Sequence, residues 1–245
     1  MVAVKARMMV AAVLLGALLA AAVPTKVEAA GPVLLDERFE SLDRWRPLTF
    51  PKISRHSRYS ADRCNGEPCL RMESDDAASA LVLRQEFNVY DYPRLAWRWK
   101  VSNVYRKGDS RTKAGDDYPA RLYVMFAFDP ARASLGKRLK YGLARTVYGS
   151  YPPDSTISYI WDNRATGAPF IVNAYTAAAR MIPVSAGTAK VGTWQEYEVD
   201  IVRDYRLAFG EDPPAAASLA VMIDSDDTGE LARAWIRYIR LFRAP

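Results

Sequence analysis

The chain has 245 residues, is 50% hydrophobic and 25% charged, and carries a formal net charge of +6 at pH 7. This length and hydrophobic content are enough for a sizeable folded core. The basic residues form no dense run with interleaved aromatic residues that could follow a phosphate backbone, so the composition argues against a nucleic-acid-binding protein.

Residues 1–29 have the organisation of a secretory signal peptide. Lys5 and Arg7 precede an apolar stretch, 8–23, and the sequence VEA at 27–29 has the small residues of a cleavage site. The apolar stretch is short for a membrane span, which needs about 20 residues, so cleavage is favoured over a retained anchor. We therefore expect an exported protein that is periplasmic or secreted.

The remaining chain, 30–245, is predicted to be one all-β domain. Short apolar alternations are separated by Gly, Pro and Asp turns, which is the pattern of strands with one buried face. No other segment is apolar enough to cross a bilayer. The strands are enough for two packed antiparallel sheets, and their predicted ranges are 33–39, 69–74, 80–87, 95–101, 120–128, 157–162, 194–201, 218–224 and 232–242.

Two segments have helical patterns. Residues 134–148 carry one apolar stripe with basic residues around it. Two interpretations stay open: a helix that covers one end of the sandwich, or a basic helix that contacts a membrane surface or a protein partner. The segment IVRDYRLAFGEDPP has Gly210 at a C-cap position with Pro213 beyond it, which predicts a short connecting helix.

Cys64 and Cys69 are the only cysteines, and they flank the turn in CNGEPC. The Asn-Gly pair between them favours a hairpin, and in an oxidising compartment the two cysteines are expected to form a disulfide. A metal or redox site is not favoured here. The spacing is not C-x-x-C, and His56, the only histidine, is not placed to join them.

The alternation of side chains along two predicted strands suggests a charged surface. In LAWRWKV the two tryptophans share a face with apolar neighbours and belong to the core, which leaves Arg98 and Lys100 on the opposite face. In ARLYVMF the same reasoning puts Arg121 and Tyr123 opposite the apolar residues. If both strands turn their apolar faces inward, these four residues lie together on one side of one sheet.

Asp116 and Asp117 lie in the loop that leads into the second of these strands. Two interpretations stay open. A carboxylate pairs with Arg121 or Arg98 and neutralises a semi-buried guanidinium, or the groups hydrogen-bond the hydroxyls or carboxylates of a sugar-like ligand. Because adjacent residues on an extended chain face opposite ways, we expect one aspartate to pair and the other to face the ligand.

Tyr159 and Trp161 are two residues apart in SYIWDNR, beside Asp162 and Asn163. An aromatic face next to carboxylates and amides suits a sugar subsite, because the ring contacts the sugar and the polar groups bind its hydroxyls. The same pattern fits an ordinary core strand that ends in a turn, and both interpretations stay open.

The segment DSDDTGE places Asp224, Asp226 and Thr228 at the oxygen spacing of an EF-hand loop, with Gly229 at the glycine position. The twelfth position, however, is Trp235 rather than Glu, and no helix leads into the segment. The alternatives are a Ca²⁺ site that takes further ligands from elsewhere, or a tight Asx-rich hairpin between the last two strands. No other cofactor is expected.

Several stretches resemble a bacterial family of exported proteins known only as a domain of unknown function. The resemblance implies a jelly-roll, galactose-binding-like β-sandwich with one or two short inserted helices, similar to carbohydrate-binding modules, and it implies no catalytic residues. The stretches are LDRWRPLTFPKISRHSRY, LAWRWKV, GDDYPARLYVMF, YGSYPPDSTISYIWDNR, FGEDPP and DSDDTGE.

The expected function is non-catalytic binding of a polar, carbohydrate-like or anionic cell-envelope ligand on one sheet face. No nucleophile motif accompanies His56, and Asp116 and Asp117 point apart, so no catalytic pair is predicted. Two alternatives stay open: a polysaccharide lyase or glycosidase that uses the same face, with a Tyr base and an Arg in the lyase case, or an envelope protein that docks through the basic helix 134–148. The expected ligand-binding residues are Arg98, Lys100, Asp116, Asp117, Arg121, Tyr123, Tyr159 and Trp161.

Overall fold

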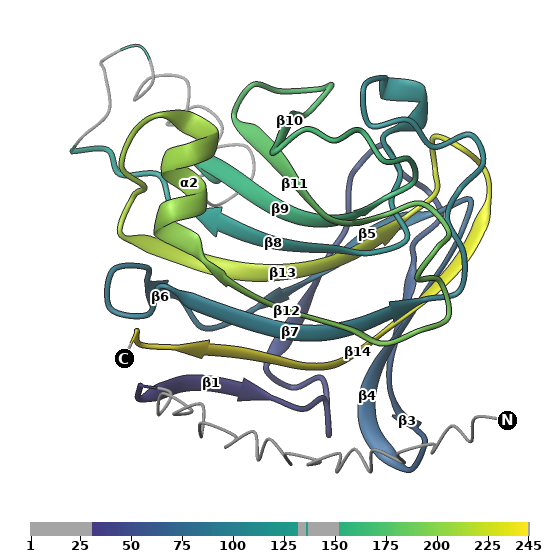
Figure 1. The fold of residues 1–245 in the computed structure, drawn as a ribbon, viewed down its shortest axis with the longest axis horizontal. Coiled ribbons are helices and arrows are strands. Elements are labelled where there is room, and N and C mark those ends of the chain that lie inside the picture. The colour runs from purple at the N-terminus through teal and green to yellow at the C-terminus, as the bar shows by residue number, and fades with distance from the viewer. Residues whose placement is uncertain (1–30, 132–135, 137–151, 245) are drawn as a thin grey trace, which may run out of the picture.

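The computed structural model describes residues 31–131, 136 and 152–244. Most of this chain forms strands in two sheets (Figure 1). Sheet A consists of β1 (Val33–Glu37), β3 (Arg58–Cys64), β4 (Glu67–Asp75), β7 (Arg94–Val101), β12 (Gln195–Asp200) and β14 (Leu231–Phe242). Sheet B consists of β2 (Trp45–Leu48), β5 (Ala78–Leu83), β6 (Phe87–Asn88), β8 (Arg121–Phe126), β9 (Ser155–Asp162), β10 (Ile171–Val172), β11 (Ala179–Ala186) and β13 (Ala216–Asp224).

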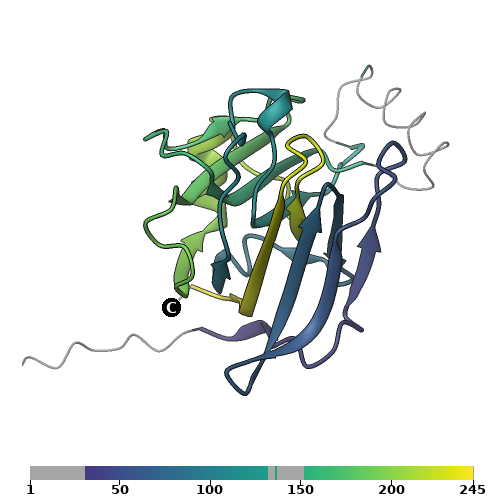
Figure 2. The same cartoon turned by 90° about the vertical axis from the view of Figure 1, so that its right-hand side faces the viewer.

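The strand order confirms the predicted β-sandwich. Sheet A runs β12-β7-β14-β4-β3, with β1 beside β14, and sheet B runs β10-β11-β9-β8-β13-β5-β2, with β6 beside β13. Figure 2 shows β3, β4 and β14 running side by side. The neighbouring strands pair antiparallel as expected, with one exception among the described strands, because β11 pairs with β9 in parallel.

The core lies between the two sheets and is rich in aromatic side chains. Trp97 and Trp99 on β7 are fully buried, as their apolar company predicted, and the Trp97 ring lies 5.1 Å from the ring of Tyr159 on β9. Leu122 and Val124 on β8 are also fully buried and join the same core. The core therefore fixes which side of β7 and of β8 is left for other contacts.

The hairpin between β3 and β4 is closed by the predicted disulfide. Cys64 and Cys69 are bonded, with their Cα atoms 5.9 Å apart. Asn65 and Gly66 between them both have positive φ angles, 54° and 83°, as the tight two-residue turns of hairpins require. This prediction is confirmed.

The predicted connecting helix is α2 (Ile201–Phe209). The Asp200 side chain caps its first turn by accepting a hydrogen bond from the Arg203 amide, and Gly210 ends it with a φ angle of 74°. Residues 1–29 and the predicted basic helix 134–148 lie outside the described residues, apart from position 136. Within the described part of the chain, no helix is long and apolar enough to cross a membrane.

The connection between β13 and β14, residues 225–230, crosses from sheet B to sheet A. The predicted hairpin between the last two strands is therefore wrong, because the two strands pair with different partners and not with each other. Figure 1 shows this yellow connection and the short 3₁₀ helix η1 (Lys113–Gly115) at the same end of the sandwich. The loop after η1 carries Asp116 and Asp117.

Candidate ligand-binding face and acidic cluster

The charged residues predicted to share one surface lie in two different sheets. Arg98 and Lys100 are on β7 of sheet A, whereas Arg121 and Tyr123 are on β8 of sheet B. The alternation of side chains assigned each strand's faces correctly, but it does not say which sheet a strand joins. The prediction of one common surface is therefore wrong, and the two pairs belong to separate sites.

On the outer face of sheet A, basic side chains gather around two indole rings. The charged groups of Arg98, Lys100 and Arg237 lie 5.8, 5.1 and 5.2 Å from the centre of the Trp194 ring. The Lys100 ammonium also lies 4.6 Å from the Trp235 ring. These distances are those of cation–π contacts, and we call the five residues the basic indole surface.

Neighbouring strands of sheet A bring this surface together. Trp194 directly precedes β12, whose first residue pairs with Trp99 on β7, and Lys100 pairs with Trp235 on β14. A bulge in β14 between Ile236 and Tyr238 interrupts the regular register next to Arg237. Trp194 and Trp235 are both half-buried, so part of each indole remains accessible to solvent.

Among the described residues, the cations of the basic indole surface have no acidic partner. Within the described part of the chain, none of Arg98, Lys100 and Arg237 forms an ion pair. Arg237 donates one hydrogen bond of 2.9 Å to the Cys64 carbonyl, while its Nε is buried without a partner. Glu196 lies opposite Arg98 in the register, but its carboxylate accepts a hydrogen bond of 2.6 Å from the Tyr238 hydroxyl.

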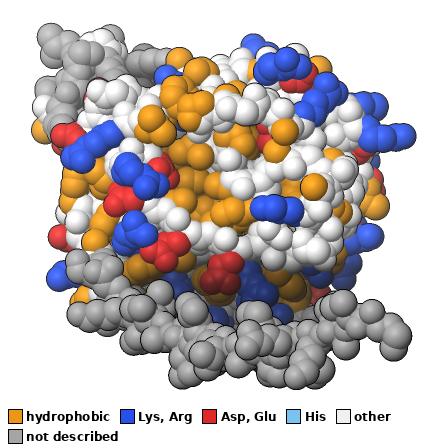
Figure 3. All heavy atoms as spheres, in the orientation of Figure 1, with side chains coloured by type: hydrophobic (Ala, Val, Ile, Leu, Met, Phe, Trp, Pro, Cys, Tyr) orange, Lys and Arg blue, Asp and Glu red, His pale blue; other side chains and the backbone are white. Residues whose placement is uncertain are grey.

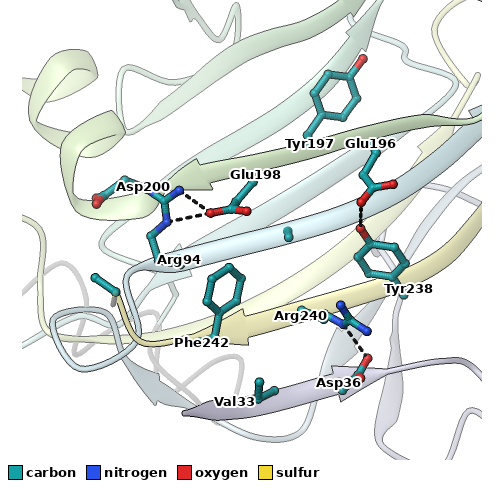
Figure 4. A pocket seen from close by; sticks show the side chains of 12 residues that line it. Val33, Asp36, Arg94, Glu196, Tyr197, Glu198, Asp200, Tyr238, Arg240 and Phe242 are labelled. Atoms are coloured by element: carbon teal, nitrogen blue, oxygen red, sulfur yellow. Dashed lines mark hydrogen bonds and ion pairs between the residues drawn. The ribbon is translucent and has the colours of Figure 1, made fainter. Parts of the chain in front are cut away.

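A hollow of about 850 Å³ adjoins this surface along β12, β7, β14 and β1 (Figure 4). Two ion pairs line it, in which Arg94 Nε donates to Glu198 at 3.1 Å and Arg240 Nε donates to Asp36 at 3.2 Å, and the carboxylates of Glu196 and Asp200 line it as well. Figure 3 shows basic and acidic side chains next to one another, with hydrophobic ones exposed between them. The hollow therefore offers hydrogen-bonding groups, with four carboxylates against two arginines in its lining.

Arg121 is buried and its main partner is Asp224. Its Nε donates to Asp224 Oδ1 at 3.0 Å, and its Nη2 donates to Asp224 Oδ2 and to the Asp116 carbonyl. The Asp116 carboxylate is more distant, with 3.8 Å between Oδ1 and Arg121 Nη1. The guanidinium also lies 4.1 Å from the centre of the Tyr118 ring. Arg121 thus joins the end of β13 to the loop that leads into β8.

Asp117 points away from Arg121, as expected for a neighbour of Asp116 on an extended segment. Its carboxylate Oδ2 accepts a hydrogen bond of 2.6 Å from the Thr228 amide, and its Oδ1 is buried without a partner. Asn163 donates 2.6 Å to the Asp117 carbonyl and holds the loop in place. Asp116 thus approaches the arginine and Asp117 does not; that Asp117 faces a ligand stays a prediction.

Asp117, Asp224 and Asp226 together form the acidic cluster. One carboxylate oxygen from each lies within 4.8 Å of the corresponding atoms of the other two. Burial is the largest effect on the Asp117 and Asp226 carboxyls, and it raises the pKa of each above the ordinary value. The sequence pattern found Asp224 and Asp226 but could not connect them with Asp117, which is distant along the chain.

Tyr159 and Trp161 belong to the core. Both are fully buried; the Tyr159 hydroxyl donates to Asp204 at 3.1 Å and the Trp161 indole donates to the Gly187 carbonyl at 3.1 Å. A sugar cannot stack on rings that lie between two sheets, so the core interpretation of SYIWDNR is correct. The half-buried aromatic residues that sequence reasoning missed are Trp194 and Trp235, although the alternation of ARAWIR placed Trp235 opposite the apolar residues.

Tyr123 does not fit the base of a lyase. Burial raises its pKa to about 12, so the hydroxyl stays protonated near neutral pH. Arg121 Nη1 donates to this hydroxyl at 3.2 Å, which occupies one of its lone pairs. The residues proposed for lyase chemistry on this strand are therefore packed together rather than poised for proton abstraction.

The described strands define a two-sheet β-sandwich of the jelly-roll type. Residues 43–240 match the family described as "Protein of unknown function (DUF3047)", and the chain belongs to this family. The comparison with curated proteins finds no match.

Some solved structures are similar in fold. The family 11 carbohydrate-binding module of a cellulosomal cellulase of Clostridium thermocellum has a TM-score of 0.44 and 8% identity, over 87% of this chain and 95% of that chain. The K3 cleaved adhesin domain of Lys-gingipain from Porphyromonas gingivalis has a TM-score of 0.41 and 10% identity, over 86% and 99%. The Emp47p carbohydrate recognition domain has a TM-score of 0.41 and 10% identity, over 83% and 90%. Scores and identities this low do not indicate a shared ligand.

Proposed function

We propose that this protein is an exported, non-catalytic β-sandwich module that binds an anionic carbohydrate of the cell envelope on the outer face of sheet A. The observation that carries the proposal is the basic indole surface, where Arg98, Lys100 and Arg237 converge on Trp194 without an acidic partner in the described part of the chain. Cations that are not needed for internal ion pairs are available to a ligand.

The chemistry of this surface suits a sugar that carries carboxylates or sulfates. An indole contacts the C–H groups of a sugar ring, and a guanidinium binds a carboxylate through two parallel hydrogen bonds. The adjoining hollow adds the paired groups Arg94–Glu198 and Tyr238–Glu196, which can hydrogen-bond hydroxyls. A polysaccharide chain could then lie across β12, β7 and β14.

Export rests on residues 1–29, whose sequence is that of a secretory signal peptide. The Cys64–Cys69 disulfide fits an oxidising compartment. Expression in a bacterium followed by fractionation and N-terminal sequencing tests this part. A mature protein in the periplasm or medium that begins near residue 30 is expected, and an uncleaved chain in the membrane fraction would contradict it.

The binding experiment compares acidic with neutral polymers. Affinity electrophoresis and calorimetry with polygalacturonate, alginate and dextran sulfate should detect binding, while dextran and laminarin bind at least tenfold more weakly. Because the interaction is largely between charges, it should weaken as salt is raised. The absence of binding to all acidic polymers would contradict the proposal, and shortening of any polymer would favour the polysaccharide-acting enzyme instead.

The variants Trp194→Ala and Arg98→Ala/Lys100→Ala locate the site. Each should weaken binding about tenfold or more, which corresponds to about 1.4 kcal/mol. Lys52→Ala is the matched control, because Lys52 is exposed on the loop after β2, away from the basic indole surface. If binding to acidic polymers or anionic vesicles is unchanged in the Trp194 variant, the ligand contacts another surface, such as the basic segment 134–148.

A further inference from the structure

The acidic cluster lies at the β13–β14 connection, and the proposed carbohydrate binding on the outer face of sheet A does not explain it. Asp224 ends β13, Asp226 lies in the connection that crosses to sheet A, and Asp117 comes from the loop that leads into β8. Two chain segments that are distant in the sequence thus bring their carboxylates together where the chain passes from sheet B to sheet A; Figure 1 shows the course of the β13–β14 connection.

The spacing of the carboxylates fits one hard cation. Oxygen ligands lie about 2.4 Å from Ca²⁺, so two ligands of the same ion are separated by at most about 4.8 Å. One carboxylate oxygen from each of Asp117, Asp224 and Asp226 lies within 4.8 Å of the corresponding atoms of the other two. The donor set contains only oxygen, which favours Ca²⁺ over the metals that prefer sulfur or imidazole.

Buried polar atoms without partners mark the same place. Asp117 Oδ1 and Thr228 Oγ1 are buried, on residues that are 0% and 2% exposed, and neither atom forms a hydrogen bond of good geometry, although the Thr228 hydroxyl lies beside the Asp117 carboxylate. The Thr228 amide donates to the other Asp117 oxygen, so both orphaned atoms belong to residues in direct contact. Buried polar groups are nearly always satisfied in folded proteins, which indicates a ligand between these atoms.

The carboxylates around the acidic cluster outnumber the basic side chains that pair with them in the described part of the chain. In the described part of the chain, Arg121 is the basic residue that pairs with this group, and it contacts Asp224 and Asp116. Asp117 and Asp226 have no ion pair with a basic side chain among the described residues. Oδ1 of Asp224 accepts from Arg121 Nε and from the Tyr118 amide, whereas Oδ2 accepts only from Arg121 and keeps a lone pair.

We propose that one Ca²⁺ ion binds between Asp117, Asp226, Thr228 Oγ1 and the Oδ2 atom of Asp224, and fastens the β13–β14 connection to the loop before β8. Waters or main-chain carbonyls complete the coordination, as is usual for this ion. Asp117 is the ligand that distinguishes this site from a linear EF-hand loop. The ion would tie sheet A to sheet B at the end where their strands are joined by a crossing segment.

Terbium luminescence tests the site directly on the whole purified chain. Tb³⁺ replaces Ca²⁺ at oxygen sites and emits when a nearby aromatic ring is excited. The Tyr118 amide donates to Asp224 Oδ1 at 3.1 Å, and the Tyr118 ring lies 4.1 Å from the Arg121 guanidinium that pairs with Asp224, so this ring can excite the ion. After chelation and dialysis, Tb³⁺ should bind saturably with one ion per chain, and Ca²⁺ should displace it. Displacement by Mg²⁺ at an equal concentration would overturn the assignment to Ca²⁺.

Three variants and one control locate the ion. Asp117→Asn, Asp226→Asn and Thr228→Val should each weaken Ca²⁺ binding at least tenfold and reduce the rise in Tm that Ca²⁺ causes, because an ion bound only to the folded state stabilises it by mass action. Asp91→Asn, at an exposed position in the turn before β7, should leave both unchanged.

If Asp117→Asn does not fold, Asp226→Asn carries the test, because Asp226 is half-buried and tolerates the change better. The proposal is wrong if the native chain binds no Tb³⁺ or Ca²⁺ at millimolar concentration, or if the three variants bind as the native chain does. Neither result would affect the carbohydrate proposal, since its residues lie in sheet A.

Discussion

Two regions of this molecule use arginine and carboxylates in opposite proportions. On sheet A, the Glu73 carboxylate is in contact with Arg58, Arg71 and Arg233, while the basic indole surface nearby has no paired acid among the described residues. At the acidic cluster, Arg121 is the one basic side chain in the described part of the chain that forms an ion pair with a cluster carboxylate, that of Asp224. The overall charge of +6 therefore conceals a base-rich face and an acid-rich end.

Burial decides what each region can do. Arg98 and Lys100 are half-buried and reach solvent, so their charges cost little and are free to meet a ligand. Arg121 is 4% exposed, so its charge must be neutralised within the protein. The same residue type is thus accessible to solvent and without an acidic partner among the described residues in one region, and internally paired in the other.

The largest expected effect is the loss of the buried pair. Arg121→Met leaves Asp224 buried without its main partner, and we expect the free energy of unfolding to fall by about 3–5 kcal/mol, measured by chemical denaturation. The double variant Arg121→Met/Asp224→Leu should lose less, because no charge is stranded. Equal losses in the single and double variants would show that packing rather than charge matters at this site.

The next largest effect is the loss of stability when the Cys64–Cys69 disulfide, which lies beside the basic indole surface, is removed. Reduction, or Cys64→Ala/Cys69→Ala, should lower the free energy of unfolding by about 2 kcal/mol, since the loop it closes is short. The Cys64 carbonyl accepts a hydrogen bond from Arg237, so the loss should also weaken binding of acidic polymers. Unchanged binding in the reduced protein would separate the hairpin from the basic indole surface.

The two regions should respond to pH in opposite directions. The hydrogen bond from Arg58, followed by that from Arg233, lowers the pKa of Glu73 to about 2, so its stabilisation is complete above the unfolded value of 4.5 and is lost as the pH falls toward 2. Burial raises the pKa of Asp117 and Asp226, so the folded state holds protons there longer than the unfolded chain and stability falls as the pH rises above 3.8.

Denaturation at several pH values in the presence of a chelator measures these slopes. Glu73→Gln should remove part of the loss at acidic pH, and Asp226→Asn should remove part of the loss that follows deprotonation of the acidic cluster. If both variants change the free energy of unfolding over the same range of pH, the contrast between the two regions does not hold.

The smallest expected effect is the change in protein stability when cations of the basic indole surface are replaced. Arg98→Ala and Lys100→Ala should change the free energy of unfolding by less than about 0.5 kcal/mol, because neither side chain has an ion pair in the described part of the chain. Their effect on ligand binding should be much larger. A substantial loss of stability would indicate that the cation–π contacts with Trp194 serve the fold rather than a ligand.

Local patterns in the sequence determined much of the fold. Each strand that alternation predicted is present, and the Asn-Gly turn with its disulfide and the Gly210 cap are found where expected, because these features depend on residues close together in the chain. The strands β2, β3, β10 and β11 were not predicted, and β6 only touches the end of a predicted range. β3 is largely exposed and polar, β6 and β10 have two residues each, β2 has four, and β11 is mostly half-buried, so they carried little hydrophobic alternation.

Only the tertiary structure decided how the strands combine. Alternation correctly put Arg98 and Arg121 opposite the core, but the assignment of β7 to sheet A and β8 to sheet B depends on pairing between distant segments. The same holds for Asp117, which meets Asp224 and Asp226 because the chain crosses between the sheets there. A residue's periodicity fixes the face it occupies on its own strand, whereas its neighbours across the fold are set by long-range contacts that no local pattern encodes.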